Sequence, residues 1–194
     1  MAPDPTPLAL AKSRLRRQMR RVRAGEPPQA AEAAAGHLPP SLLRAARIVA
    51  GYHPQGGEID PLPVLRRFAA AGAQLALPSA VAAEAPLVFR AWSEGDALQP
   101  DIFGIPSPAP QRPTVQPDLI LAPVLAFDRR GGRIGQGAGC FDRTLAQARA
   151  LGPVFVIGLA FASQEIERAP IAAHDQALDA ILTESGYIEA EEDS

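Results

Sequence analysis

The chain has 194 residues, of which 47% are hydrophobic, and its formal net charge is −2. This length supports one well-formed core and is short for two full domains. The charge lacks the basic excess that is typical of proteins that bind duplex nucleic acid. The single cysteine, Cys140, excludes an intramolecular disulfide and favours a reducing, cytoplasmic compartment, and no apolar run approaches the ~20 residues that span a bilayer.

Residues 1–28 are rich in arginine, which is a feature of transit peptides. The segment also contains Asp4 and several early prolines and lacks a long apolar core, so we interpret it as part of the mature protein. Within it, residues 8–24 predict a helix, because leucine, methionine and valine fall near one stripe and arginines cover the rest. Glu26-Pro27-Pro28 is expected to end this helix.

The rest of the chain alternates apolar runs with helix-forming segments. The apolar runs predict strands at residues 47–52, 74–78, 87–92, 118–125, 154–158 and 178–183. Helices are predicted at residues 29–35, 61–71 and 141–151, the second of them capped by Asp60. The proline-rich segment 100–117 is expected to be a surface loop, and the acidic tail 189–194 is expected to be frayed. This alternation predicts a single-domain, three-layer α/β/α fold with a largely parallel sheet, on which helix 8–24 packs.

The segment GGRIGQGAGCFDR, residues 131–143, lies between a predicted buried strand and a predicted helix. Glycines let successive backbone N–H groups turn toward one anion, and the start of the following helix adds its positive end. Arg133 and Arg143 could donate charge-assisted hydrogen bonds to phosphate, and Asp142 could hold Mg²⁺ beside it. The pattern matches neither a Walker A loop nor a Rossmann fingerprint. By itself it fits a nucleotide-phosphate site and a helix-capping turn equally well.

The surrounding sequence favours the first interpretation. Residues 122–146, APVLAFDRRGGRIGQGAGCFDRTLA, resemble the signature of the 5-formyltetrahydrofolate cyclo-ligase family, also called 5,10-methenyltetrahydrofolate synthetase. Further stretches resemble the family in the same order, and they are KSRLR at 12–16, GYHPQGGEID at 51–60, LALP at 75–78, FGIPSP at 103–108, GLAFASQ at 158–164 and HDQALDAILTE at 174–184. The resemblance covers essentially the whole chain, and several spaced motifs are more specific than one loop.

The resemblance implies an enzyme that uses ATP and Mg²⁺. In the family's reaction, ATP phosphorylates the formyl oxygen of 5-formyltetrahydrofolate, N10 attacks the activated carbon, and phosphate leaves to give 5,10-methenyltetrahydrofolate. Because phosphorylation makes a poor leaving group into a good one, the protein's part is mostly positioning and charge stabilisation. The expected partner is this small-molecule folate, with no nucleic acid and no membrane, and the expected state is a monomer.

The positions that match the family motifs imply roles for individual residues. Lys12 and Arg16, four residues apart on one helical face, would hold ATP phosphates. The remaining residues of the implied ATP site are Arg133, Gly135, Gln136, Gly137, Ala138, Gly139, Cys140 and Phe141. The implied folate site comprises His53, Glu58, Gln136, Gly137, Ala138, Gly139 and Cys140. Asp142 and Asp175 would ligate Mg²⁺.

Other polar residues near these motifs have simpler expected roles. Asp128 is expected to brace the glycine loop, and His174 to be a packed loop histidine. The other arginines of the first helix are expected on a solvated face, and they are Arg14, Arg17, Arg20, Arg21 and Arg23. Lys12 is the only lysine in the chain, which fits a position that prefers a compact ammonium group. The Glu58 carboxylate suits the paired N–H edge of a pterin.

The chain departs from the family pattern mainly on the implied folate side. The residues that differ are Ser107, Gln136, Ala138, Cys140, Phe141 and Ala173. Gln136 stands where tyrosine is usual, and Cys140 and Phe141 replace two tyrosines whose hydroxyl groups could orient the formyl group. The chain is therefore either a working cyclo-ligase with altered folate affinity or a diverged relative that binds ATP and acts on another formamide or carboxamide.

Two further function classes fit parts of the sequence. A non-catalytic regulator that binds nucleotides or phosphosugars could share such a fold, but the combination of Lys12, Arg16, Glu58, Asp142 and Asp175 favours the enzyme. An RNA-binding protein could use the basic first helix. The negative net charge and the aromatic content of 5% disfavour that class.

Overall fold

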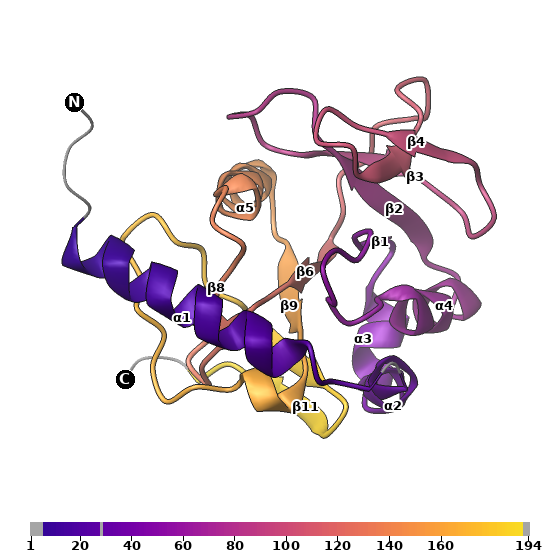
Figure 1. Ribbon diagram of the computed structural model, residues 1–194. Helices are drawn as coiled ribbons and strands as arrows, with labels where there is room; N and C mark the ends of the chain where they lie inside the picture. The colour runs from indigo at the N-terminus through magenta and orange to yellow at the C-terminus, as the bar shows by residue number, and fades with distance from the viewer. Residues whose placement is uncertain (1–5, 28, 192–194) are drawn as a thin grey trace.

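The structure is a computed structural model that describes residues 6–27 and 29–191. Its centre is a seven-stranded sheet with the order β11-β10-β9-β6-β1-β2-β3 (Figure 1). The strands of this sheet are β1 (Ile48–Ala50), β2 (Gln74–Ser79), β3 (Val88–Ala91), β6 (Leu119–Pro123), β9 (Phe155–Leu159), β10 (Ala180–Thr183) and β11 (Gly186–Glu189). The inner strands are parallel, while β3 and β11 pair antiparallel at the two edges. The prediction of a largely parallel sheet is confirmed.

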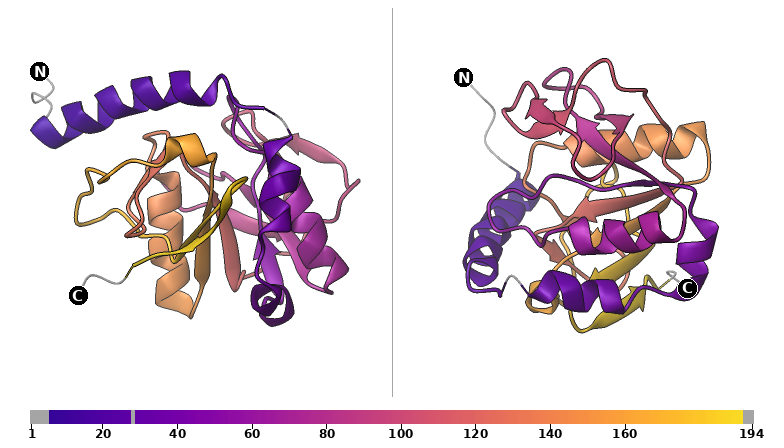
Figure 2. Two further views of the ribbon diagram at one scale, coloured as in Figure 1. Left: turned by 90° about the horizontal axis from the view of Figure 1, so that it is seen from below. Right: turned by 90° about the vertical axis from the view of Figure 1, so that its right-hand side faces the viewer.

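Helices cover both faces of the sheet, as Figure 2 shows. These helices are α2 (Ala30–Gly36), α3 (Pro40–Ala45), α4 (Leu62–Ala70) and α5 (Cys140–Leu151). α2, α3 and α4 pack on one face, and α5 packs on the other. Along β6, Leu121 faces the first helical layer and Ile120 faces α5. Because both faces of this strand are buried, its sequence is a continuous apolar run, and the predicted three-layer α/β/α fold is confirmed.

The predicted elements are present, with ends that shift by only a few residues. The Asp60 carboxylate accepts a hydrogen bond from the Leu62 N–H at 2.9 Å at the start of α4, but the N-cap residue is Pro61, one position later than predicted. Residues 1–5, 28 and 192–194 lie outside the described residues, and they include Asp4, Pro28 of the expected helix stop and the end of the expected tail.

Two sequence predictions about irregular segments are wrong in part. The segment expected to be a surface loop, 100–117, contains β5 (Pro106–Pro108), which pairs with β4 (Leu98–Pro100). Proline has no backbone N–H to donate between strands, but a two-stranded sheet of this length needs few such hydrogen bonds. The tail is ordered as far as Glu191, because Glu189 belongs to β11 and the Glu191 N–H donates to the Arg129 carbonyl at 2.9 Å.

The first helix, α1 (Pro7–Arg23), lies across the carboxyl ends of the parallel strands (Figure 2). Thr6 caps it, accepting from the Ala9 N–H at 3.2 Å. Its apolar face, represented by Met19, packs on the hairpin of β7 (Ala126–Phe127) and β8 (Arg133–Ile134). Its basic face is thereby held against the loops that follow the strands. Neither α1 nor any other helix in the described ranges is long and apolar enough to cross a bilayer.

Candidate active site

The basic face of α1 contacts the glycine loop. The Arg16 Nε donates to the Gly135 carbonyl at 2.9 Å, and the Arg20 Nη2 donates to the Gln136 Oε1 at 3.2 Å. Lys12, Arg16 and Arg20 are spaced by four residues, so they lie on one side of the helix. The helix therefore brings two cations, Arg16 and Arg20, to the loop that the sequence singled out, while Lys12 on the same side reaches Asp175.

The part of the glycine loop next to α5 adopts conformations that favour glycine at two positions. Gly137 has φ +112° and Gly139 has φ +67°, both in the region that favours glycine. A Cβ atom on Gly139 would also lie 2.9 Å from the Arg143 Nη1. Between them, Ala138 is exposed, and its carbonyl accepts from the Arg143 Nη2 at 3.2 Å. The loop thus presents an open backbone surface directly before the N-terminus of α5.

The first turn of α5 carries the remaining residues of the signature. Cys140 is partly exposed, and its Sγ lies 3.7 Å from the Arg143 Nη2. Phe141 is partly buried and packs against the clusters on both faces of the sheet. Cys140 therefore faces the loop, whereas Phe141 anchors the helix start to the core.

The two carboxylates expected to ligate a metal are both paired with cations. The Asp142 Oδ1 accepts from the Arg133 Nη2 at 2.5 Å and from the Gln176 N–H at 3.1 Å. Asp175 forms an ion pair with Lys12 and accepts from the Ala172 N–H at 2.6 Å. Since Gln176 follows Asp175 in the chain, these bonds hold both carboxylates in one region.

Burial and hydrogen bonding act in opposite directions on Asp175. Burial by itself would raise the pKa of its carboxyl group, because the charged form loses solvation. Hydrogen bonds from Lys12 and the Ala172 N–H outweigh that effect, so the pKa lies below its ordinary value. Lys12 and a backbone N–H group therefore stabilise the charged form of Asp175.

Arg133 is a brace in this structure. Only 5% of the residue is exposed, and its Nε donates to the Gln176 carbonyl at 3.1 Å in addition to its ion pair with Asp142. Burial lowers the pKa of its guanidinium, while Asp142 and Asp175 act to raise it. The side chain therefore fixes the orientation of Asp142 and ties α5 to the loop that carries Asp175.

Asp128 organises the turn of the β7–β8 hairpin. It is 3% exposed and accepts hydrogen bonds from the backbone N–H groups of Arg130, Gly132 and Ala169 at 3.0, 2.9 and 2.7 Å. A Cβ atom on Gly132 would lie 2.6 Å from the Asp128 Oδ2. The prediction that Asp128 braces the glycine loop is confirmed.

Three of the residues expected on the folate side, His53, Glu58 and Gln136, lie close together. The Glu58 Oε2 accepts from the Gln55 N–H at 3.0 Å, and the Glu58 Oε1 accepts from the Gln136 Nε2 at 3.1 Å. The His53 Nδ1 lies 3.2 Å from the Gln55 Nε2. Glu58, His53 and Gln136 are therefore neighbours in one hydrogen-bonded group that includes Gln55.

Two expectations about polar residues need correction. Arg23 was expected on a solvated face but is 4% exposed, and its Nη2 donates to the Gly56 carbonyl at 2.7 Å. His174 was expected to be packed, but its side chain is 81% exposed. Arg20 is exposed, as expected, and it also contacts Gln136. The signal for the arginines was their spacing from Lys12 and Arg16 on one helical face.

The donor set fits a magnesium ion that is shared with phosphates. In the described part of the chain, no group of three or more His, Cys, Asp or Glu side chains could hold a metal by itself. Mg²⁺ at nucleotide sites commonly takes one or two carboxylates and completes its shell with phosphate oxygens and water. Asp142 and Asp175 supply that number of carboxylates.

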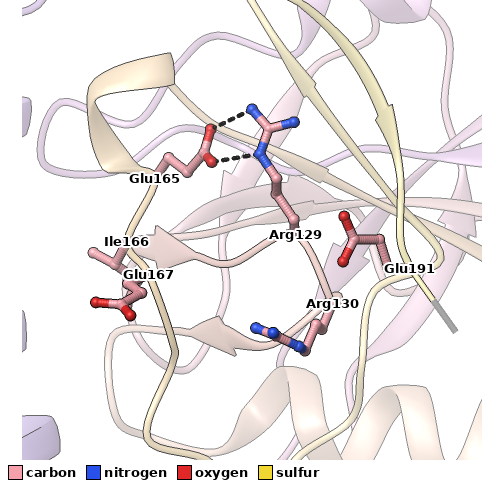
Figure 3. A pocket seen from close by; sticks show the side chains of 6 residues that line it. All are labelled: Arg129, Arg130, Glu165, Ile166, Glu167 and Glu191. Carbon is pink, nitrogen blue, oxygen red and sulfur yellow. Dashed lines mark hydrogen bonds and ion pairs between the residues drawn. The ribbon is translucent and has the colours of Figure 1, made fainter. Parts of the chain in front are cut away.

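Two pockets lie away from these residues. One, of about 450 Å³, is lined by Arg129, Arg130, Glu165, Ile166, Glu167 and Glu191 (Figure 3). Within it Arg129 and Glu165 form an ion pair at 2.7 Å. The other, of about 400 Å³, lies between α5 and β3 near the amino end of β6. The candidate site is distinguished by the convergence of charged groups.

Comparisons with known proteins identify the family to which the chain is similar. The family model described as "5-formyltetrahydrofolate cyclo-ligase family" matches residues 9–184. The 5-formyltetrahydrofolate cyclo-ligase of Mycolicibacterium smegmatis is 34% identical over 170 residues, which are 84% of this chain and 84% of that protein. The enzyme of the same name from Escherichia coli is 31% identical over 154 residues, covering 76% and 82%.

Solved structures show the same fold. The 5,10-methenyltetrahydrofolate synthetase of Aquifex aeolicus superposes with a TM-score of 0.76 at 25% identity and covers 94% of each chain. The synthetase of Mycoplasma pneumoniae superposes with a TM-score of 0.65 at 19% identity, covering 89% of this chain and 98% of that one, which supports the fold alone. The family match spans nearly the whole chain, and the chain belongs to the 5-formyltetrahydrofolate cyclo-ligase family of ligase enzymes.

Proposed function

We propose that this protein converts 5-formyltetrahydrofolate to 5,10-methenyltetrahydrofolate in a reaction that consumes ATP and requires Mg²⁺. One observation carries the proposal: two cations and two carboxylates lie beside the glycine loop. Lys12 pairs with Asp175, Arg16 donates to the loop, and the Gln176 N–H next to Asp175 donates to Asp142. Family membership and the names of the relatives support the reaction type.

The nucleotide half of the reaction uses the glycine loop. Backbone N–H groups of residues 135–139 and the N-terminus of α5 would bind the phosphates. Lys12 and Arg16 would add charge-assisted hydrogen bonds to the same oxygens. Asp142 and Asp175 would hold Mg²⁺, which neutralises the charge that develops on the phosphates during transfer. Arg133 keeps Asp142 in place for this role.

The folate half uses Glu58 and its neighbours. Glu58 would accept hydrogen bonds from the pterin, with His53 and Gln136 lining the same side. The terminal phosphoryl group of ATP passes to the formyl oxygen and leaves ADP. N10 then attacks the formyl carbon and loses its proton, and phosphate departs with the former formyl oxygen. The protein's part is to hold N10 and the activated carbon in contact and to exclude water.

A direct assay tests the proposal. Purified protein is mixed with 5-formyltetrahydrofolate, ATP and Mg²⁺, and the methenyl product is followed by its near-ultraviolet absorbance, with Asp142→Ala as the matched variant. We expect product that depends on ATP and on Asp142. Tight ATP binding without product would instead identify a diverged relative or a non-catalytic nucleotide-binding protein.

The replaced tyrosines allow a second comparison within the same assay. Cys140 lies beside the glycine loop, where a tyrosine hydroxyl could orient the formyl group. If the chain is a cyclo-ligase with altered folate affinity, Cys140→Tyr lowers the KM for folate and leaves ATP dependence unchanged. An unchanged KM would show that the position tolerates both residues. The monomeric state and the cytoplasmic location remain predictions.

A further inference from the structure

Arg23, at the end of α1, carries hydrogen-bond donors that the protein does not satisfy. Its side chain is 3% exposed, and its Nη2 donates to the Gly56 carbonyl at 2.7 Å. Its Nε and Nη1 are fully buried and have no hydrogen-bond partner among the described residues. A buried guanidinium with unused donors is costly, and such groups are usually completed by a water, an ion or a ligand.

Glu58 lies next to these donors but does not accept a hydrogen bond from them. The Arg23 Nη1 is 3.8 Å from the Glu58 Oε1, which is too long for a hydrogen bond. The Glu58 side chain is 6% exposed. Burial lowers the pKa of the Arg23 guanidinium, and the charge of Glu58 offsets this only in part. A cation with unfilled donors and an anion with free acceptor capacity thus stand side by side.

The other cations of this helical face have different partners. Arg16 donates to Gly135, Arg20 donates to Gln136, and Lys12 pairs with Asp175. Among the basic residues of α1 that reach the site, Arg23 is the one that borders the loop carrying Glu58. Its contacts therefore belong to the folate side, whereas those of Lys12 and Arg16 belong to the nucleotide side.

The adjacent pair matches the chemistry of one edge of the substrate. The pyrimidine ring of a 2-amino-4-oxopteridine presents an acceptor, the 4-oxo oxygen, next to two donors, the ring N3–H and the 2-amino group. A carboxylate can take both donors, and a neighbouring guanidinium can then donate to the oxygen. We propose that Arg23 binds the 4-oxo oxygen of the pterin while Glu58 accepts from the two N–H groups. The inference rests on the proposed function and adds a residue that selects the oxo form.

Ligand binding without ATP separates this role from a purely structural one. Folic acid and its 4-amino analogue, which lacks the oxo acceptor, are titrated into wild-type protein and Arg23→Gln by calorimetry. In Arg23→Gln we expect the affinity for folic acid to fall by about ten- to a hundredfold, the usual range for a hydrogen bond to a charged group. The affinity for the 4-amino analogue should change little, so the ratio of the two affinities shifts.

Controls keep the outcome decisive. Arg17→Gln, on the exposed side of the same helix, should leave both affinities unchanged. Arg23→Lys keeps a buried cation if Arg23→Gln does not fold, and it should retain part of the preference for the oxo ring. Equal weakening of both ligands, or no change in either, would overturn the inference. Failure of the proposed function would instead appear as absence of ATP-dependent product in the wild-type protein.

Discussion

The nucleotide side and the folate side of the site compensate their charges differently. On the nucleotide side, Asp142 and Asp175 are each paired with a cation and with a backbone N–H group. On the folate side, Arg23 and Glu58 are adjacent but 3.8 Å apart, and two donors of Arg23 are unused. On the nucleotide side the charges are already paired within the protein. On the folate side, hydrogen-bond donors remain free for a ligand.

This difference has a consequence for ligand binding. Under the proposed function, Mg²⁺ and phosphates would take over partners that the protein already supplies, and Lys12 would exchange Asp175 for phosphate as the metal takes Asp175. The folate ring would instead complete hydrogen bonds that the protein leaves unmade. Binding on the nucleotide side would therefore exchange existing ion pairs for new ones, whereas binding on the folate side would add hydrogen bonds without breaking any.

Removing the charge of Asp142 should disrupt the nucleotide side most strongly. In Asp142→Asn, the proposed Mg²⁺ site would lose a ligand, and the buried Arg133 loses its counter-charge. We expect turnover to fall by at least about a hundredfold and the free energy of unfolding to fall by about 3 kcal/mol. Steady-state kinetics and denaturant unfolding measure these two effects. Folic acid binding should persist, and its loss would contradict the separation of the two sides.

Removing the carboxylate of Asp128 should loosen the glycine loop without touching either ligand. Asp128→Ala leaves three backbone N–H groups without their acceptor, two of them in the hairpin turn. The expected loss is about 3 kcal/mol in the free energy of unfolding, measured by denaturant titration. Asp96→Ala, which removes an exposed ion pair with Arg112 and one exposed hydrogen bond from the Ser93 N–H, is the matched control and should cost under about 1 kcal/mol.

Gln136 links the two sides, so its replacement should act on folate more than on ATP. The amide donates to Glu58 and accepts from Arg20, and Gln136→Leu removes both contacts at similar size. We expect the KM for 5-formyltetrahydrofolate to rise by about three- to tenfold, since both hydrogen bonds are exposed to solvent and contribute modestly. The KM for ATP should stay constant. Equal increases in both constants would show that Gln136 supports the loop as a whole.

The Lys12–Asp175 pair should contribute a small acid-dependent stability. The folded-state pKa of Asp175 is lowered, so its contribution is present above the unfolded value of about 3.9 and is lost as the pH falls through the folded value. Unfolding at pH 6, 4 and 3 measures this loss, which Asp175→Asn should reduce. An identical pH dependence in the variant would show that other carboxylates account for the acid limb.

Local patterns in the sequence were sufficient for most of the fold. The apolar run at 118–125 predicted β6, and it is buried on both faces in the structure. The short elements escaped prediction because their pairing partners are not visible locally. β5 holds two prolines and pairs with β4 through only three residue pairs, so neither strand has a period to detect. β11 exists because β10 offers it an edge.

For the site, the motifs singled out residues that the fold brings together, including Lys12 with Asp175 and Gln136 with Glu58. Sequence spacing showed that Arg23 shares a helical face with Arg16, but composition favoured a solvated side chain. Its burial depends on how the end of α1 meets the loop that follows β1, 33 residues further along the chain. No local pattern reports such a contact.

The sequence by itself determined the layered α/β fold, the place of the glycine loop between strand and helix, and the family to which the chain belongs. These depend on hydrophobic periodicity and on motifs, which are local properties. Only the tertiary structure decided which arginines are buried, which carboxylates pair with a cation, and which hydrogen-bond donors remain unused. Those properties are set by contacts between distant segments and by the removal of water around them, so they exist only once the chain has folded.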